Sequence, residues 1–166
     1  LGLSAKLEGP LSGTARVIGR RSAPFGPLLV NGDAGTYYGL RYQDLKLDSE
    51  LRGTLSEARA GSARIGGGTI AFRGTLTDDA VYDGSAEAEA VDASALLPAV
   101  GPDLAWGGPV SGKVRLQGKL EAPTLELELS SRRLFLGDEG VGALQAKASG
   151  SGDGQVGFQA TCRSPR

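Results

Sequence analysis

The chain nearly repeats itself at a spacing of 99 residues. The segment 9–24 returns as 108–123, and eight of the 16 aligned positions are identical. The shared pattern is Gly-Pro-Leu/Val-Ser-Gly-x-x-Arg-Val/Leu-x-Gly, followed by Ala-Pro. Repeated units stack on one another instead of folding around a single enzyme-like centre, so the repeat predicts a function carried by an extended surface.

The repeat also predicts the organisation of the chain. The first β-repeat unit covers 1–107, and a partial second unit covers 108–166, because only 59 residues run from Gly108 to Arg166. We therefore expect this sequence to be an internal piece of a longer repeat protein.

Apolar and polar residues alternate along most of the chain. In the second copy Val110, Val114 and Leu116 alternate with Lys113 and Arg115, as expected for a β-strand with one face turned to water. The first copy keeps the same phase, although Ile18 places an apolar residue on the polar side.

Further strand candidates recur at regular spacing along the sequence. They lie at about 2–8, 27–31, 36–42, 45–51, 53–60, 68–77, 80–91, 125–129, 132–136, 142–149 and 154–162. Breaks such as Gly66-Gly67-Gly68 and Asp83-Gly84 separate them. This spacing predicts a mostly β fold, an antiparallel meander of short strands.

One short helix is expected near 92–97. Asp92 is a suitable N-cap, and Pro98 is expected to end the helix. Leu96 and Leu97 would then pack against one end of the sheet.

The composition argues against catalysis. The chain has no histidine and a single cysteine, Cys162, so it lacks the commonest acid-base group and any multi-cysteine metal site. Cys162 alternates with Phe158 and Ala160, which favours a strand residue over a nucleophile. The pairs Glu87/Glu89 and Glu126/Glu128 fall on polar strand faces, where solvated charges are expected. We therefore expect no enzyme activity, no cofactor and no metal.

The charges are balanced and interspersed. Eighteen basic and nineteen acidic residues leave a net charge of −1, which provides no field for binding a phosphate backbone, so nucleic acid is disfavoured. The alternating apolar face therefore carries most of the information about function. It predicts either an ordinary closed core or an open groove for a long apolar ligand.

Three segments resemble a known family. They are the repeated Gly-Pro motif at 9–24 and 108–123, the strand 68–76 leading to Tyr82-Asp83-Gly84, and the segment 91–97. On these segments the chain resembles the AsmA-like superfamily and, within it, the TamB-type translocation and assembly proteins of the Gram-negative envelope.

The resemblance implies an open, curved, taco-like β-sheet with a hydrophobic interior. It further implies a periplasmic or cell-envelope protein, anchored in the inner membrane by a segment outside this chain. Such a protein would conduct phospholipid acyl chains toward the outer membrane, and an outer-membrane β-barrel assembly partner would link it to autotransporter assembly. The residues expected to line the groove are Val17, Ile70, Phe72, Val110, Val114, Leu116, Leu125, Leu127 and Leu129.

Two other classes of protein remain as alternatives. A structural or adhesive β-repeat of a surface protein would close the same apolar face as a solid core. A carbohydrate-acting β-domain would need exposed aromatic residues and a convergent acid pair, and an aromatic content of 5% argues against it.

Overall fold

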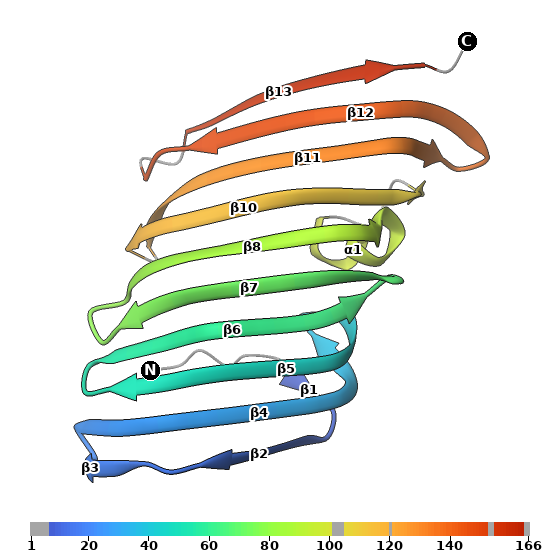
Figure 1. Cartoon of the computed structure of the whole chain (residues 1–166). Coiled ribbons are helices and arrows are strands. Elements are labelled where there is room, and N and C mark those ends of the chain that lie inside the picture. Colours follow the sequence, from blue (N-terminus) through green and yellow to red (C-terminus); the bar gives the residue numbers. More distant parts are fainter. Residues whose placement is uncertain (1–6, 101–104, 120, 153–154, 165–166) are drawn as a thin grey trace.

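The computed structural model describes residues 7–100, 105–119, 121–152 and 155–164. Within these ranges the chain forms one antiparallel sheet and one helix (Figure 1). The elements are β1 (Leu7–Glu8), β2 (Leu11–Ala15), β3 (Ile18–Arg20), β4 (Ala23–Tyr37), β5 (Leu40–Arg52), β6 (Leu55–Ile65), β7 (Gly68–Thr77), β8 (Val81–Asp92), α1 (Ala93–Val100), β9 (Trp106–Gly107), β10 (Pro109–Lys119), β11 (Ala122–Leu136), β12 (Glu139–Gly150) and β13 (Val156–Arg163).

Each long strand pairs with its neighbour in sequence. The order is β4-β5-β6-β7-β8-β10-β11-β12-β13, with α1 and β9 inserted between β8 and β10. The short strands β1, β2 and β3 all pair with β4 and make one edge of the sheet, and β13 makes the other. The predicted mostly β, open antiparallel meander with one short helix is confirmed.

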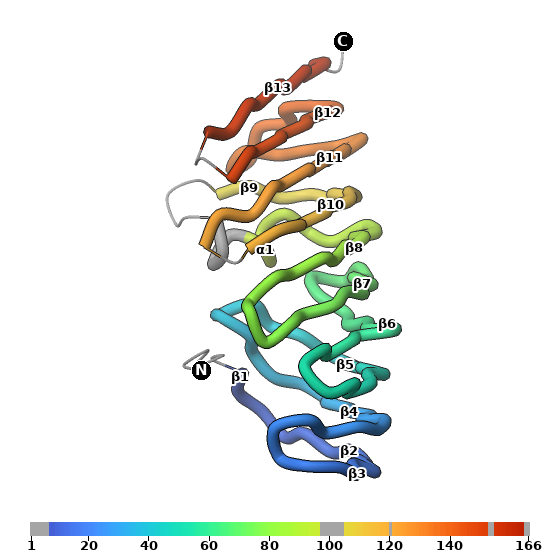
Figure 2. The backbone as a smooth tube through the Cα atoms, turned by 90° about the vertical axis from the view of Figure 1, so that its left-hand side faces the viewer, coloured from blue at the N-terminus to red at the C-terminus, as the bar shows by residue number. Residues whose placement is uncertain are grey.

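The sheet is bent as well as twisted. Seen along the strands in Figure 2, the strands curve, and α1 lies on the inner side of the curve. The helix therefore covers part of one face and leaves the opposite face to solvent.

The strand pairing repeats with the sequence. Gly13 pairs with Val30 and Gly112 with Leu129, an offset of 99 for both partners. The strands β4 and β11 begin and end at positions that also differ by 99. The sheet continues across the boundary between the copies, because β10 pairs with β8 on one side and β11 on the other.

Two pairs of equivalent glycines share an unusual backbone. Gly9 and Gly108 have φ values of 123° and 101°, and Gly19 and Gly118 have values of 102° and 103°. L-residues rarely adopt this region, so glycine is required there. At Gly108 a Cβ atom would also lie 2.2 Å from the carbonyl oxygen of Arg133. The recurrence of glycine in the motif therefore follows from the backbone.

The turns partly match the expectation. Gly66 and Gly67, with φ values of 55° and 79°, form the β6–β7 turn as predicted. The predicted break at Asp83-Gly84 is wrong, because both residues lie inside β8. The predicted strand 36–42 is also wrong, because a tight turn at Tyr38-Gly39 interrupts it. Tyr38 adopts a φ of 49°, a positive value that is uncommon for tyrosine, so its residue type does not predict the turn.

The helix begins as expected but runs further. The Asp92 carboxylate accepts hydrogen bonds from the Ser94 backbone N–H at 2.8 Å and, through its other oxygen, from the Gly108 N–H at 3.3 Å. The expectation that Pro98 ends the helix is wrong, since α1 continues to Val100. Two residues, Ala99 and Val100, follow Pro98 within the helix.

A small buried cluster lies beneath α1, and Leu134 and Ala146 are buried outside it. Tyr42, Ala63, Ile65 and Val91 are buried, and Leu96 packs against them. The side chain of Leu97 lies outside the described residues. Away from this cluster most apolar side chains of the sheet are only half-buried, because no second sheet covers them in the part of the chain that the structure describes.

Candidate functional site

The candidate site is a strip of apolar side chains that crosses the sheet from edge to edge. Residues paired directly across two antiparallel strands point to the same face, so the pairing register shows which side chains share it. The middle row of the strip is Gly13, Val30, Leu47, Gly61, Phe72, Ala86, Val114, Leu127, Ala148 and Phe158. This row contains no polar side chain.

The rows on either side of the middle row are also almost entirely apolar. On one side lie Leu11, Gly32, Leu45, Ala63, Ile70, Ala88, Gly112, Leu129, Ala146 and Ala160. On the other side lie Ala15, Leu28, Ser49, Ala58, Gly74, Gly84, Leu116, Leu125, Gly150 and Val156. The only polar member is Ser49, which donates its hydroxyl to the Leu28 carbonyl oxygen at 3.1 Å. We call these three rows the apolar strip.

The strip has the dimensions of a hydrocarbon groove. Ten strand positions about 4.8 Å apart give it a length of about 43 Å, and three rows about 7 Å apart give it a width of about 14 Å. No charged residue interrupts it over that area. The buried cluster beneath α1 includes or contacts Leu45, Ala63, Ile70 and Ala88 of the strip. Ala146 is also buried, and most of the remaining strip side chains are half-buried or exposed.

Neighbouring side chains fill the space beside most glycines in the strip. The Phe72 ring occupies the space beside Gly61, where a Cβ atom would lie 2.2 Å from a ring carbon. Likewise the Leu129 side chain covers Gly112, and the Tyr82 ring covers Gly84. The strip is therefore a continuous apolar surface without deep pits at these glycines.

Seven of the nine residues predicted to line a groove lie in the strip. They are Ile70, Phe72, Val114, Leu116, Leu125, Leu127 and Leu129. Val110 pairs with Val91 and is only 7% exposed, so it belongs to the buried region near α1. Val17 lies between β2 and β3 and is 46% exposed.

Sequence reasoning missed most of the strip in the first copy. Leu28 and Val30 stand at the positions equivalent to Leu127 and Leu129, and the structure places both pairs on the same face. The offset of 99 applied to the predicted residues would have found them.

The opposite face is charged and contains a surface depression of about 1250 Å³. Five acidic and five basic side chains line it: Glu57, Asp83, Glu87, Glu126, Glu128, Arg59, Arg73, Lys113, Arg115 and Lys147. The charges form cross-strand pairs, such as Lys113 with Glu87 at 2.9 Å and Lys147 with Glu128 at 2.5 Å. Because the charges cancel, this depression has no net charge that would select an ion.

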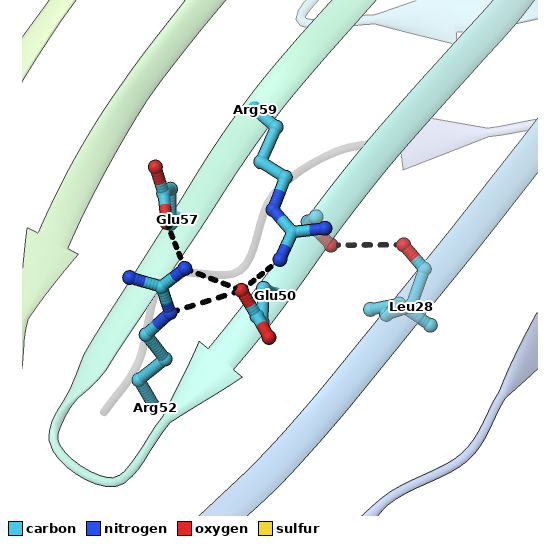
Figure 3. A network of polar contacts seen from close by, with 6 residues as sticks. Leu28, Glu50, Arg52, Glu57 and Arg59 are labelled. Atoms are coloured by element: carbon cyan, nitrogen blue, oxygen red, sulfur yellow. Dashed lines mark hydrogen bonds and ion pairs between the residues drawn. The ribbon is translucent and has the colours of Figure 1, made fainter.

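Figure 3 shows the densest charge network of this face. Glu50 lies directly opposite Glu57 on the next strand, a repulsive arrangement. Arg52 donates to a Glu50 oxygen from Nε at 2.9 Å and from Nη2 at 2.7 Å, and Arg59 contacts the same oxygen. These hydrogen bonds, first that of Arg52 and then that of Arg59, lower the pKa of the Glu50 carboxyl below its ordinary value.

The described residues offer little for metal or redox chemistry. Among them, no group of three or more His, Cys, Asp and Glu side chains is arranged to hold a metal ion. Cys162 is exposed on β13, and its thiol donates to the Val141 carbonyl oxygen at 3.3 Å. No described helix has the length and hydrophobicity needed to cross a membrane.

Comparisons with known proteins add no assignment. No protein-family model matches the chain, and searches of curated proteins and of solved structures found no match. The likeness to AsmA-like proteins therefore rests on the sequence motifs.

Proposed function

We propose that the apolar strip holds the acyl chains of phospholipids and shields them from water during transfer between the two membranes of a cell envelope. The observation that carries the proposal is the uncharged strip that spans the whole sheet and that, among the described residues, no second sheet covers and α1 covers only in part. An open apolar face of this size is unusual on a soluble surface and indicates a hydrophobic partner.

The energetics favour a long, flexible apolar ligand. Each methylene group that leaves water contributes about 0.8 kcal/mol, so a chain lying along the strip gains affinity with every strand it crosses. The strip reaches both edges of the sheet, so the ligand can slide along it. A lipid headgroup would remain in water beyond the strip, and no specific polar contact is needed.

The charged face complements this role. Its paired acids and bases stay hydrated, which keeps that side of the sheet in water while the strip holds the lipid. Within this proposal the whole protein is anchored in the inner membrane and located in the periplasm, and an outer-membrane β-barrel protein is its partner. We propose no catalytic step.

A lipid-binding comparison tests the proposal. Leu127→Asp places a carboxylate in the middle row, and Gln145→Asp places the same group on the charged face of β12. We expect the wild-type chain and Gln145→Asp to bind a naturally fluorescent long-chain fatty acid and to retain phospholipid in native mass spectrometry. We expect Leu127→Asp to bind at least about tenfold more weakly, because ligand binding would desolvate the new charge.

Circular dichroism of both variants checks that the sheet is intact. If the wild-type chain binds neither probe, or if the two variants bind equally well, the lipid proposal is wrong. Absence of binding together with a second layer over the strip would support the adhesive β-repeat with a closed core.

A further inference from the structure

One segment of β4 is apolar on both faces of the sheet. Phe25, Pro27 and Leu29 alternate with Leu28 and Val30 of the strip, so they lie on the outer face, which is the face opposite the strip. All three are exposed, Phe25 to 49% and Leu29 to 45%. Strands that are apolar on both faces are typical of sheets that are covered on both sides, so this part of the outer face indicates a hydrophobic partner.

The equivalent strand of the second copy lacks this property. The outward residues of β11 that correspond to those of β4 are Thr124, Glu126 and Glu128. Both strands lie inside the sheet, because β4 pairs with β2, β3 and β5, and β11 pairs with β10 and β12. The exposure of Phe25 and Leu29 is therefore independent of the sheet edge. A further strand beside β2 and β3 would pair with their backbone and leave this face open.

An isoleucine and three arginines adjoin these residues. Ile18 on β3 lies directly opposite Phe25 and is 69% exposed. Arg16 and Arg20 flank Ile18 on the same face, and Arg21 lies in the two-residue turn that joins β3 to β4, at the lower left of Figure 1. None of these three guanidinium groups forms an ion pair with a described side chain. We define the outer patch as Ile18, Phe25, Pro27 and Leu29 together with Arg16, Arg20 and Arg21.

The outer patch has an excess of positive charge. On β5, Asp48 lies opposite Leu29 and is the nearest acid outside the network of Figure 3. The acids of that network are balanced by its own arginines. Three arginines therefore stand against Asp48. Exposed apolar side chains beside such arginines match an anionic lipid surface, because the apolar groups enter the interface while the cations stay among the headgroups.

We propose that the outer patch docks the first copy of the repeat onto an anionic phospholipid bilayer. Ile18 and Phe25 each lie three positions from the β3–β4 turn, so the end of this hairpin reaches the headgroups before the rest of the sheet. The outer face of the second copy carries ion pairs, such as Lys113 with Glu87, which would be costly to remove from water. Docking is therefore confined to the first copy. The proposal does not depend on what occupies the strip.

The size of the outer patch favours a membrane over a protein partner. From Phe25 to Leu29 the patch extends about 13 Å along β4, and it contains four apolar side chains. A stable protein interface uses roughly 20–30 residues on each side. The charge network beside the patch leaves little apolar surface to extend it. A bilayer requires no matching shape, and each arginine near an anionic surface adds to the binding.

Vesicle binding tests the proposal. We expect the wild-type chain to co-sediment with phosphatidylcholine vesicles that contain about one-third phosphatidylglycerol, and to bind phosphatidylcholine alone at least about tenfold more weakly. Arg20→Gln with Arg21→Gln should weaken binding to the anionic vesicles at least about tenfold. Arg132→Gln with Arg133→Gln removes the same charge elsewhere and should change binding less than about twofold. A wild-type chain that does not bind the anionic vesicles, or equal losses for the two double variants, would overturn the proposal.

A tryptophan probe tests which residues enter the bilayer. In a Trp106→Phe background, the fluorescence of Phe25→Trp should shift to the blue on binding anionic vesicles, and brominated lipids should quench it. Thr124→Trp in the same background places the probe at the equivalent position of the second copy and should show neither change. Equal quenching at both positions would disprove the assignment to the outer patch.

Two further variants separate membrane docking from ligand binding in the strip. Leu127→Asp alters the strip and should bind anionic vesicles as the wild type does. Ile18→Gln with Phe25→Thr introduces the residues of the second copy, and should lose vesicle binding but still bind the fluorescent fatty acid. Loss of vesicle binding in Leu127→Asp alone would show that the strip contacts the bilayer and would overturn the proposal. Binding of a peptide of alternating Glu and Leu, without vesicle binding, would indicate a protein partner and would also overturn it.

Discussion

The two copies of the repeat share their apolar rows and most of their pairing register but differ in their charges and in their bulges. Leu28 corresponds to Leu127, and each lies in the apolar strip. By contrast, Glu128 and Lys147 form an ion pair, while their equivalents are Leu29 and Asp48. The comparison indicates that the apolar face is the shared property of the repeat, and that the charge pairs are specific to each copy.

The bulge in β6 shows how one extra residue moves a side chain to the other face of the sheet. In β6 the extra residue Arg59 lies between Ala58 and Ala60, which pair with Ser49 and Asp48. Its sequence equivalent is Phe158, and β13 has no bulge there. Inserting one residue reverses the side-chain alternation locally, so Arg59 reaches Glu50 on the charged face while Phe158 belongs to the apolar strip.

The largest predicted effect concerns the equivalent glycines Gly108 and Gly9. Gly108→Val should lower the free energy of unfolding by about 3 kcal/mol, because the residue needs a positive φ and closely approaches Arg133. Gly9→Val should cost less, about 1 to 2 kcal/mol, because Gly9 lies at the sheet edge and its local strands can fray. Urea unfolding followed by circular dichroism measures both. Equal losses would show that the edge is as rigid as the middle of the sheet.

An intermediate effect is expected for the two phenylalanines of the middle row. Phe72→Ala should cost about 2 kcal/mol, because the half-buried ring fills the space over Gly61. Phe158→Ala should change the free energy of unfolding of the monomer by no more than about 0.5 kcal/mol, because Phe158 is mostly exposed. Urea titrations measure these values. A large loss for Phe158→Ala would contradict its placement at an open edge.

The smallest predicted effect is a dependence of stability on pH that arises from Glu50. Only the first copy has it, since the equivalent residue in the second copy is Ser149. The lowered pKa of Glu50 means that its contribution to stability is present above the unfolded-state value of about 4.3 and is lost as the pH falls through the folded-state pKa. Arg52→Gln should raise the pKa of Glu50 more than Arg59→Gln does, because the Arg52 hydrogen bonds are the larger cause. Carboxyl chemical shifts in an NMR titration report both values. The reverse order would contradict the network of Figure 3.

Much of the fold was predictable because strand alternation and turn glycines are local signals. The alternation at Val114 and Leu116 correctly identified a strand and its apolar face. Local signals failed at Asp83-Gly84, where a turn-like dipeptide lies inside β8 because the long pairing of β8 with β7 and β10 continues through it. They also split β11 into two candidates, although it forms one strand through a register shift after Ser131.

The candidate site depended on both the local sequence and the tertiary structure. The sequence by itself determined which residues are apolar, their period of two, the backbone glycines of the motif and the cap at Asp92, because each of these acts within a few residues. Only the tertiary structure decided that the apolar residues of ten strands line up into one strip and that Val110 is buried near α1. It also decided that the side chain of Arg59 lies on the charged face and not among the apolar residues of its strand. The physical reason is that register and bulges are set by pairing between strands, which no single strand encodes.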